Sequence, residues 1–253
     1  MSYGFLITTY NDAKEAVEMF KSLTASIPAS EAYGVIVVDG GSSEEDKKLI
    51  QHEIGAIVGE HKDLSSALNI GYDFALRAGI EHIIWLHQDM SFHDLNWAKK
   101  LCWCYDHCFP MFGKLCPGTR NIDNSTPDVP LRGGNSCPTL IRSDVVRDLI
   151  ARDGYVYDPK FLKCYGREDW DQNRRLLELG YGFGICSLVD VFHVGMGTRS
   201  RYDSKGQDVI NADVYYNKWN MYNEPGFEID LTEIGKELRE SFEKKFDNYW
   251  YKR

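Results

Sequence analysis

Strand-like and helix-like patterns alternate along the first half of the chain. Four short apolar runs predict buried strands at residues 3–9, 34–38, 55–58 and 82–86. Apolar residues at helical spacing predict helices between them, at residues 12–25, after Ser42 or Ser43, and at residues 65–78. This alternation is typical of an α/β domain whose mixed, mainly parallel sheet is flanked by helices. In such sheets ligands bind at the carboxyl ends of the strands.

Composition narrows the classes of partner. The 253 residues are 43% hydrophobic and 26% charged, which is ordinary for one large globular domain or two small ones. The net charge is -9 and no run of Lys or Arg exceeds two residues, which argues against nucleic acid or an anionic membrane as the main partner. The N-terminus reads as a strand instead of a signal peptide, and no stretch approaches the roughly 20 apolar residues of a transmembrane segment. We therefore expect a soluble, cytoplasmic protein.

Cysteines gather in the segment CWCYDHC, with Cys102, Cys104 and Cys108, and Cys116 follows. Their spacing matches no common zinc pattern. An odd total of seven, in a chain with no export signal, favours free buried thiols over a zinc site.

The apolar run IWLHQD ends in polar residues. Side chains two apart on a strand point the same way, so His87 and Asp89 should face one site together where the strand opens to solvent. A salt-bridged strand end or a metal site would each explain this. Asp39, at the end of another predicted strand, and the pair Tyr10-Asn11 should lie at the same edge of the sheet.

The turn after the first strand excludes one kind of nucleotide site. Dinucleotide and methyl-donor enzymes need glycines there, so that the backbone can approach the cofactor. Here the turn is Thr8-Thr9-Tyr10-Asn11. Tyr10 can lie against a base and Asp39 can accept hydrogen bonds from a base or ribose, although a simple turn before Gly40-Gly41 would also account for Asp39. Phosphates would then be held by a metal, with Asp89 as its ligand.

The second half has a different composition. Residues 115–136 are rich in Gly, Pro, Asn and Asp and predict a loop. Residues 138–150 predict a strand that runs into a helix capped by Ser143 or Asp144, and residues 168–179 predict a helix ended by Gly180. Apolar residues at every fourth position predict a C-terminal helix over 230–250, with its apolar stripe in core packing.

Several motifs together resemble family 2 glycosyltransferases. In chain order they are ITTYNDAKEAVEMFKSL, VIVVDGGSSEED, LSSALNIGYDFAL, IIWLHQD, IRSDVV, GREDWDQNRRLLELGYG and VFHVGMG. The resemblance covers about residues 3–220 and implies the GT-A fold, a Rossmann-like α/β architecture. It also implies transfer of a sugar from a nucleotide-diphosphate sugar, most simply a UDP-hexose, with Mn²⁺ or Mg²⁺ as cofactor.

The resemblance also implies roles for individual residues. The nucleoside pocket would be lined by Thr8, Tyr10, Asn11, Asp39, Asn69, His87 and Gln88. The metal would be bound by Asp89, the last acid of a D-x-D-like motif, and by His193. The base would be Asp169, with Glu168 beside it, and the acceptor would meet Gly134, Asn135 and Trp170. His87 departs from the pattern, because many relatives carry Asp there, which leaves fewer carboxylates for the metal.

The reaction needs these residue types for physical reasons. A divalent ion stabilises the developing pyrophosphate, and a carboxylate takes the proton from the acceptor hydroxyl. In a single displacement the base lies opposite the leaving group, so the anomeric centre inverts. Simpler interpretations exist: Glu168-Asp169 as an acidic first helical turn, and His193 as a structural histidine.

We expect three parts: a nucleotide-sugar half at 1–115, an acceptor and catalytic half at 116–225, and a helical tail at 226–253. Two other functions stay open, a non-catalytic nucleotide-sugar-binding relative and a Rossmann-type methyltransferase or oxidoreductase. The acceptor could be a glycan, a lipid-linked saccharide, a protein or a modified nucleobase.

Overall fold

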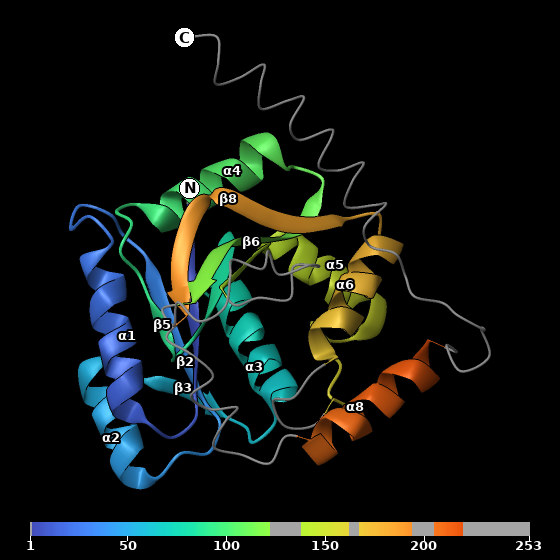
Figure 1. The fold of residues 1–253 in the computed structure, drawn as a ribbon, viewed down its shortest axis with the longest axis horizontal. Coiled ribbons are helices and arrows are strands. Elements are labelled where there is room, and N and C mark those ends of the chain that lie inside the picture. Colours follow the sequence, from blue (N-terminus) through green and yellow to red (C-terminus); the bar gives the residue numbers. More distant parts are fainter. Residues whose placement is uncertain (1, 122–137, 162–166, 194–204, 220–253) are drawn as a thin grey trace, which may run out of the picture.

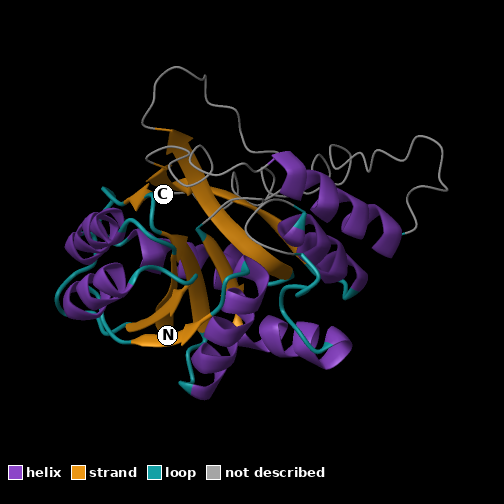
Figure 2. Ribbon diagram, turned by 90° about the horizontal axis from the view of Figure 1, so that it is seen from below, coloured by secondary structure: helices purple, strands orange, loops and turns teal. Residues whose placement is uncertain are grey.

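The computed structural model describes residues 2–121, 138–161, 167–193 and 205–219. These residues form a mixed, mainly parallel sheet of eight strands, in the order β3-β2-β1-β4-β7-β6-β8-β5, with helices packed around it (Figures 1 and 2). The predicted α/β architecture is therefore confirmed. Among the described helices, none is both long and apolar enough to cross a membrane.

The first half of the chain builds the parallel part of the sheet. Its strands are β1 (Tyr3–Thr9), β2 (Gly34–Asp39), β3 (Ile57–Glu60) and β4 (His82–His87). Each pairs with its neighbour in parallel, and the crossovers are α1 (Ala13–Ala25), α2 (Glu44–Glu53) and α3 (Leu64–Arg77). All seven elements match the sequence patterns, although β3 begins two residues later than predicted. The apolar runs of β1 and β4 are buried on both faces, as central parallel strands between helices require, whereas β3 has no fully buried residue.

The second half extends the same sheet with reversed strands. Strand β7 (Thr139–Arg142) pairs antiparallel with β4, and β6 (Phe112–Asn121) pairs antiparallel with β7. Strand β8 (Gly182–His193) is parallel to β6, and the short β5 (Met90–Ser91) is antiparallel to β8. The helices described in this half are α4 (Trp97–Cys108), α5 (Ser143–Asp153), α6 (Glu168–Glu178) and α8 (Lys205–Lys218). Helices α5, α6 and α8 lie on the side of the molecule opposite α1 and α2 (Figure 1).

The predicted loop at 115–136 is wrong over residues 115–121, which belong to β6. Gly and Pro in this segment suggest a break in the chain, and the register with β8 does shift between Pro117 and Gly118. The strand forms because β7 and β8 supply hydrogen-bonding partners on both sides, which no local pattern reveals. Residues 122–137 and the predicted helix at 230–250 lie outside the described residues.

Helix starts were predicted less well than helix ends. Asp12 and Glu15 have the spacing of a capping box, but Asp12 has φ 52° and its side chain makes no capping hydrogen bond. Instead Asp46 of α2 accepts a hydrogen bond from the Ala13 N–H at 3.2 Å. Ser43 does cap α2, as predicted, by accepting from the Asp46 N–H.

Neither residue proposed to cap α5 does so. Its N-cap is Arg142, which makes no side-chain capping hydrogen bond. The glycines expected at helix ends are confirmed, since Gly79 follows α3 with φ 72° and Gly180 follows α6 with φ 83°.

The described cysteines are free thiols, as the sequence suggested. Cys102 and Cys104 are buried in α4, and Cys116 is buried in β6. Within the described ranges, no group of three or more His, Cys, Asp or Glu residues is arranged to hold a metal ion. The cysteine segment is therefore a core helix in this structure.

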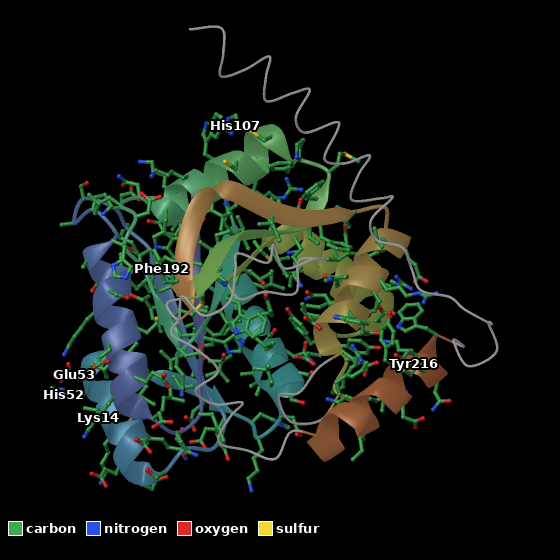
Figure 3. The ribbon with its side chains drawn as sticks, in the orientation of Figure 1. Lys14, His52, Glu53, His107, Phe192 and Tyr216 are labelled. Atoms are coloured by element: carbon green, nitrogen blue, oxygen red, sulfur yellow. The ribbon has the colours of Figure 1, made fainter. Side chains whose placement is uncertain are left out.

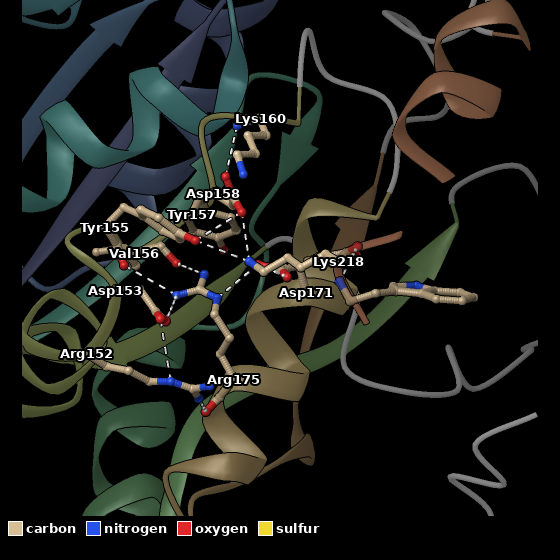
Figure 4. Close-up of polar contacts among 12 residues, drawn as sticks. Arg152, Asp153, Tyr155, Val156, Tyr157, Asp158, Lys160, Asp171, Arg175 and Lys218 are labelled. Carbon is tan, nitrogen blue, oxygen red and sulfur yellow. Dashed lines mark hydrogen bonds and ion pairs between the residues drawn. The ribbon is translucent and has the colours of Figure 1, made fainter. Parts of the chain in front are cut away.

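A buried ion-pair network joins α6, α8 and the segment after α5 (Figure 4). Arg175 and Asp171, both fully buried, pair at 2.9 Å within α6. Arg175 also meets Asp153 at 3.3 Å, while Lys218 of α8 lies 2.8 Å from Asp171 and 2.7 Å from Asp158. Each buried charge thus has an opposite charge beside it, which the low dielectric of the interior demands.

Arg175→Met should lower the free energy of unfolding by about 3–5 kcal/mol, because Asp171 loses a partner in the interior. Urea unfolding measures this. Arg77→Ala serves as the control, since the exposed Arg77–Asp73 pair should contribute less than about 1 kcal/mol. Equal losses in the two variants would show that the network does not stabilise the fold.

Candidate active site

The carboxyl ends of β1, β2 and β4 meet at one edge of the sheet. The register pairs Thr9 with Asp39 and Thr8 with His87. Tyr10 follows directly after β1, and Gln88 directly after β4. The structure therefore brings together polar residues from three separate parts of the sequence, at the edge where α/β sheets bind ligands.

Asp39 organises the turn between β2 and α2. Its buried carboxylate accepts hydrogen bonds from the Gly41 and Ser42 N–H groups at 2.8 and 2.7 Å through Oδ2. Its Oδ1 accepts from the hydroxyls of Thr9 and Ser42 at 3.1 and 2.6 Å. Asp39 therefore does form the turn that was the simpler interpretation of DGG. Because hydroxyl donors rotate, Oδ1 is the oxygen that can change partner.

The turn after β1 is held in an unusual backbone conformation. Asn11 and Asp12 have φ 51° and 52°, a region that residues other than glycine rarely adopt. The Asn11 N–H donates to the Ser42 hydroxyl at 2.7 Å. Gln88 accepts from the Tyr10 N–H at 2.8 Å and donates to the Tyr10 carbonyl at 3.3 Å. Strain fixed from two sides is common at ligand sites.

Thr8 and His87, which are neighbours in the register, both contact Trp85. The Trp85 indole N–H donates to the Thr8 hydroxyl at 3.0 Å, and the His87 ring lies 4.6 Å from the Trp85 ring between centroids. His87 is half-buried, whereas Thr8 is 7% exposed. Trp85 therefore positions both residues that were predicted to contact a nucleoside.

Asp89 lies next to the end of β8. Met90 pairs with His193 across β5 and β8, so the main chain brings the two predicted metal ligands to neighbouring positions. The next register position pairs Ser91 with Phe192, which Figure 3 labels near the end of β8. The Phe192 ring packs edge-on against His93, with the ring centroids 5.0 Å apart. These neighbours come from segments about a hundred residues apart in the chain.

Glu15 of α1 is a further acid near Asp89. The pKa of Glu15 is raised, first by burial and then by the charge of Asp89. Gln88 donates to Glu15 at 3.5 Å, so α1 also faces this strand end. Carboxylate oxygens are the ligand type that Mg²⁺ and Mn²⁺ prefer, so Asp89 and Glu15 are candidate ligands near the main-chain position of His193.

Glu168 and Asp169 form the first turn of α6, after Arg167 with φ 77°. The Asp169 carboxylate accepts from the Trp170 N–H at 2.8 Å. Burial raises the pKa of Asp169, and the positive charge of Lys114 opposes that rise. A carboxylate with a raised pKa is suited to accept a proton.

Tyr157 connects the strand end to α6. Its ring packs against Trp85 at 5.9 Å and Tyr72 at 6.1 Å. Its hydroxyl is buried and has no hydrogen-bond partner among the described residues. The pKa of Tyr157 is raised well above its ordinary value, mainly by burial, with Tyr72, Asp169 and Glu168 adding to the rise. Tyr157 thus lies within electrostatic range of both acids.

Asn69 holds the segment that carries Tyr157. Its Oδ1 accepts from the Val156 and Tyr157 N–H groups at 3.0 and 2.9 Å, and its Nδ2 donates to the Tyr157 carbonyl at 2.7 Å. The amide of Asn69 is therefore occupied by the backbone of this segment. Its predicted place beside a nucleotide stays a prediction.

The remaining predicted residues are Trp170, Gly134 and Asn135. Trp170 is 40% exposed, with the Arg167 guanidinium 4.1 Å from its ring centroid and Tyr215 of α8 packed edge-on at 6.0 Å. Gly134 and Asn135 fall outside the described residues.

Sequence reasoning missed Tyr157 and Lys114. Lys114 is 1% exposed and donates to Asn173 of α6 at 3.1 Å. A lysine inside the apolar strand FGKLC is a signal that could have identified it, because a lysine buried in this way is rare. Tyr157 carries no comparable sequence signal.

No family model and no curated protein matches the sequence. Solved structures do match the fold. One is S. aureus TarS 1–349 in complex with UDP-GlcNAc, with TM-score 0.60, 15% identity, and coverage of 91% of this chain and 69% of that one. Another is the mannosyltransferase PcManGT from Pyrobaculum calidifontis in complex with GDP-Man and Mn²⁺, with TM-score 0.54, 14% identity, and coverage of 99% and 88%. This chain therefore shares a fold with these glycosyltransferases.

Asp169→Asn should stabilise the protein at neutral and alkaline pH. The raised pKa means that the unfolded chain loses the Asp169 proton at lower pH than the folded chain does, so stability falls as pH rises through that window. The variant removes this penalty. Its gain in Tm over the unmodified protein should be larger at pH 8 than at pH 4.

The matched control is Asp73→Asn, because Asp73 is an exposed acid on α3. It should change Tm little at either pH. If the Asp169 variant gave no gain, or the same gain at both values, burial would not be governing its ionisation.

Proposed function

We propose that the protein transfers a sugar from a nucleotide-diphosphate sugar, with UDP-hexose favoured, to an acceptor hydroxyl with inversion. The observation that carries this proposal is the pairing of Met90 with His193, which brings the end of β8 next to Asp89, while the adjacent Gln88 bonds to Tyr10 at the end of β1. Binding of UDP-GlcNAc and GDP-Man by proteins of the same fold supports it. A family 2 enzyme of the GT-A type is the proposed class.

The nucleoside would be held at the β1 and β2 ends. Asp39 offers Oδ1 to a base or ribose when the Thr9 or Ser42 hydroxyl rotates away, while two backbone N–H groups keep Oδ2 fixed. The ring of Tyr10 would lie against the base, since Gln88 fixes its backbone from both sides. Thr8, Asn11, His87 and Asn69 would complete the pocket walls.

The diphosphate would meet a divalent ion held by Asp89 and His193. Bound there, Mn²⁺ or Mg²⁺ would stabilise the charge of the leaving pyrophosphate. Burial, and then the charge of Asp89, raises the pKa of Glu15, so the two carboxylates lie close together. Glu15 would therefore add negative charge near the ion and compensate for the acid that His87 replaces. Mn²⁺ is favoured, because an imidazole ligand suits it better than Mg²⁺.

Asp169 would act as the general base and Glu168 would support the helix start. Adjacent residues of a helix point about 100° apart, so one of the two acids faces the acceptor. The exposed face of Trp170 would support a sugar ring, and Gly134 and Asn135 would contact the acceptor. A glycan, a lipid-linked saccharide, a protein or a modified nucleobase could supply the hydroxyl.

A non-catalytic nucleotide-sugar-binding protein is the second candidate, because His87 stands where an acid would strengthen metal binding. The two differ in turnover. Slow metal-dependent hydrolysis of a nucleotide sugar would exclude the non-catalytic candidate.

Nucleotide sugars should stabilise the protein only together with metal. A panel of UDP-sugars and GDP-sugars with Mn²⁺ should raise Tm by about 5 °C for the true donor at about 100 times its Kd. EDTA should remove the shift, and Asp89→Ala should abolish both the shift and turnover. A full shift in EDTA, or none with any nucleotide sugar, would contradict the proposed site.

Asp169→Asn should lower the transfer rate by roughly 10²–10⁴-fold, because loss of a general base has that effect. Donor affinity should stay nearly unchanged, and Glu168→Gln should cost less. A larger loss in Glu168→Gln with the fold intact would exchange the roles of the two acids. A product that kept the donor's anomeric configuration would exclude the single displacement.

A further inference from the structure

Lys114 is a buried cation with a neutral partner. It lies in the middle of β6, is 1% exposed, and donates from Nζ to the Asn173 Oδ1 at 3.1 Å. Among the residues that the structure describes, it forms no ion pair. This sets it apart from Arg175 of the same region, which pairs with Asp171 and Asp153. Burying an ammonium against a neutral amide is unfavourable without a nearby negative charge.

Helix geometry identifies that negative charge. Asn173 lies four residues after Asp169 in α6, so the two side chains occupy the same face one turn apart. Because Lys114 reaches Asn173, its ammonium lies on the Asp169 face of the helix. The positive charge of Lys114 lowers the pKa of Asp169, which is consistent with this placement.

Other charged or titratable groups face Asp169 more weakly or with the opposite sign. Arg167, two residues before Asp169, also lowers the pKa of Asp169, but less than Lys114 does. Glu168 is an acid on the same turn, and Tyr157 comes from the segment after α5 with a neutral hydroxyl at ordinary pH. From α8, Tyr215 packs on Trp170 instead. Lys114 is thus the cation that offsets the burial of Asp169.

We propose that Lys114, anchored by Asn173, is a positioning residue that keeps the Asp169 carboxylate ionised at the start of α6. This role rests on the proposed function in one respect, namely that Asp169 is the general base. A base must be ionised to accept a proton, whereas burial raises the pKa of Asp169 and so favours its protonated form. Lys114 would resolve this conflict without touching the substrate.

The direct test needs no substrate. Carboxyl ¹³C NMR titration follows Asp169, with its signal assigned by its loss in Asp169→Asn. In Lys114→Met the carboxylate should titrate at higher pH than in the unmodified protein, and Lys114→Arg should restore the original titration. Lys99→Met, which removes a lysine that is 62% exposed, should leave it unchanged. An identical Asp169 titration in Lys114→Met and the unmodified protein would overturn the proposal.

A pH–rate profile separates this proposal from the function itself. On the acid limb, kcat/KM of Lys114→Met should fall about tenfold below the unmodified enzyme, and the two curves should converge at high pH. A lysine with only a structural role would lower kcat/KM equally at every pH, and that result would refute the proposal. Absence of transfer by the unmodified protein would instead refute the proposed function, and the NMR result would still decide the role of Lys114.

Should Lys114→Met fail to fold, Lys114→Gln keeps a polar group for Asn173 while removing the charge. It should give the same upward displacement of the Asp169 titration. An unchanged titration in a folded Lys114→Gln protein would contradict the proposal equally well.

Discussion

The buried pair of Arg175 and Asp171 is the interaction on which the candidate site depends. Arg175 also donates to the backbone carbonyls of Tyr155 and Val156, so α6 is fixed to the segment that carries Tyr157. Asn69 holds that segment from the other side, through α3. A single chain of polar contacts therefore joins α6, where the proposed base lies, to the helix that covers the parallel strands. Ion pairs suit this task because their geometry is directional, even where their net contribution to stability is small.

The site combines buried charges whose environments differ. Asp39 is saturated by four hydrogen bonds and shapes a turn. Asp169 has one backbone donor and a cation at longer range, so burial raises its pKa. This contrast separates the two acids: Asp39 orders the turn between β2 and α2, whereas the raised pKa of Asp169 suits the proton transfer proposed for it. The raised pKa costs stability at neutral pH, as is common where function requires a poorly solvated group.

The sequence predicted the parallel half of the fold well because its signals are local. Apolar runs and helical spacing depend on neighbours in the chain, and β1 to β4 with α1 to α3 followed them. The sequence did not predict features that depend on residues distant in the chain. Strand β6 forms from a Gly- and Pro-rich segment because β7 and β8 flank it, and Asp46 caps α1 in place of Asp12. For the site, the sequence did indicate which polar residues stand at the strand ends. The proximity of Asp89 to His193 needed the strand register, and Tyr157 has no sequence pattern that marks it.

The proposed function requires a nucleotide to bind where β1, β2 and β4 end. Hydrogen exchange measured by mass spectrometry, with and without UDP and Mn²⁺, tests this most directly, because ligand binding slows exchange where it orders the backbone. We expect slower exchange in residues 8–12, 39–43 and 87–91, and little change in the exposed helix α2. Protection confined to other segments, or no protection at saturating ligand, would contradict it.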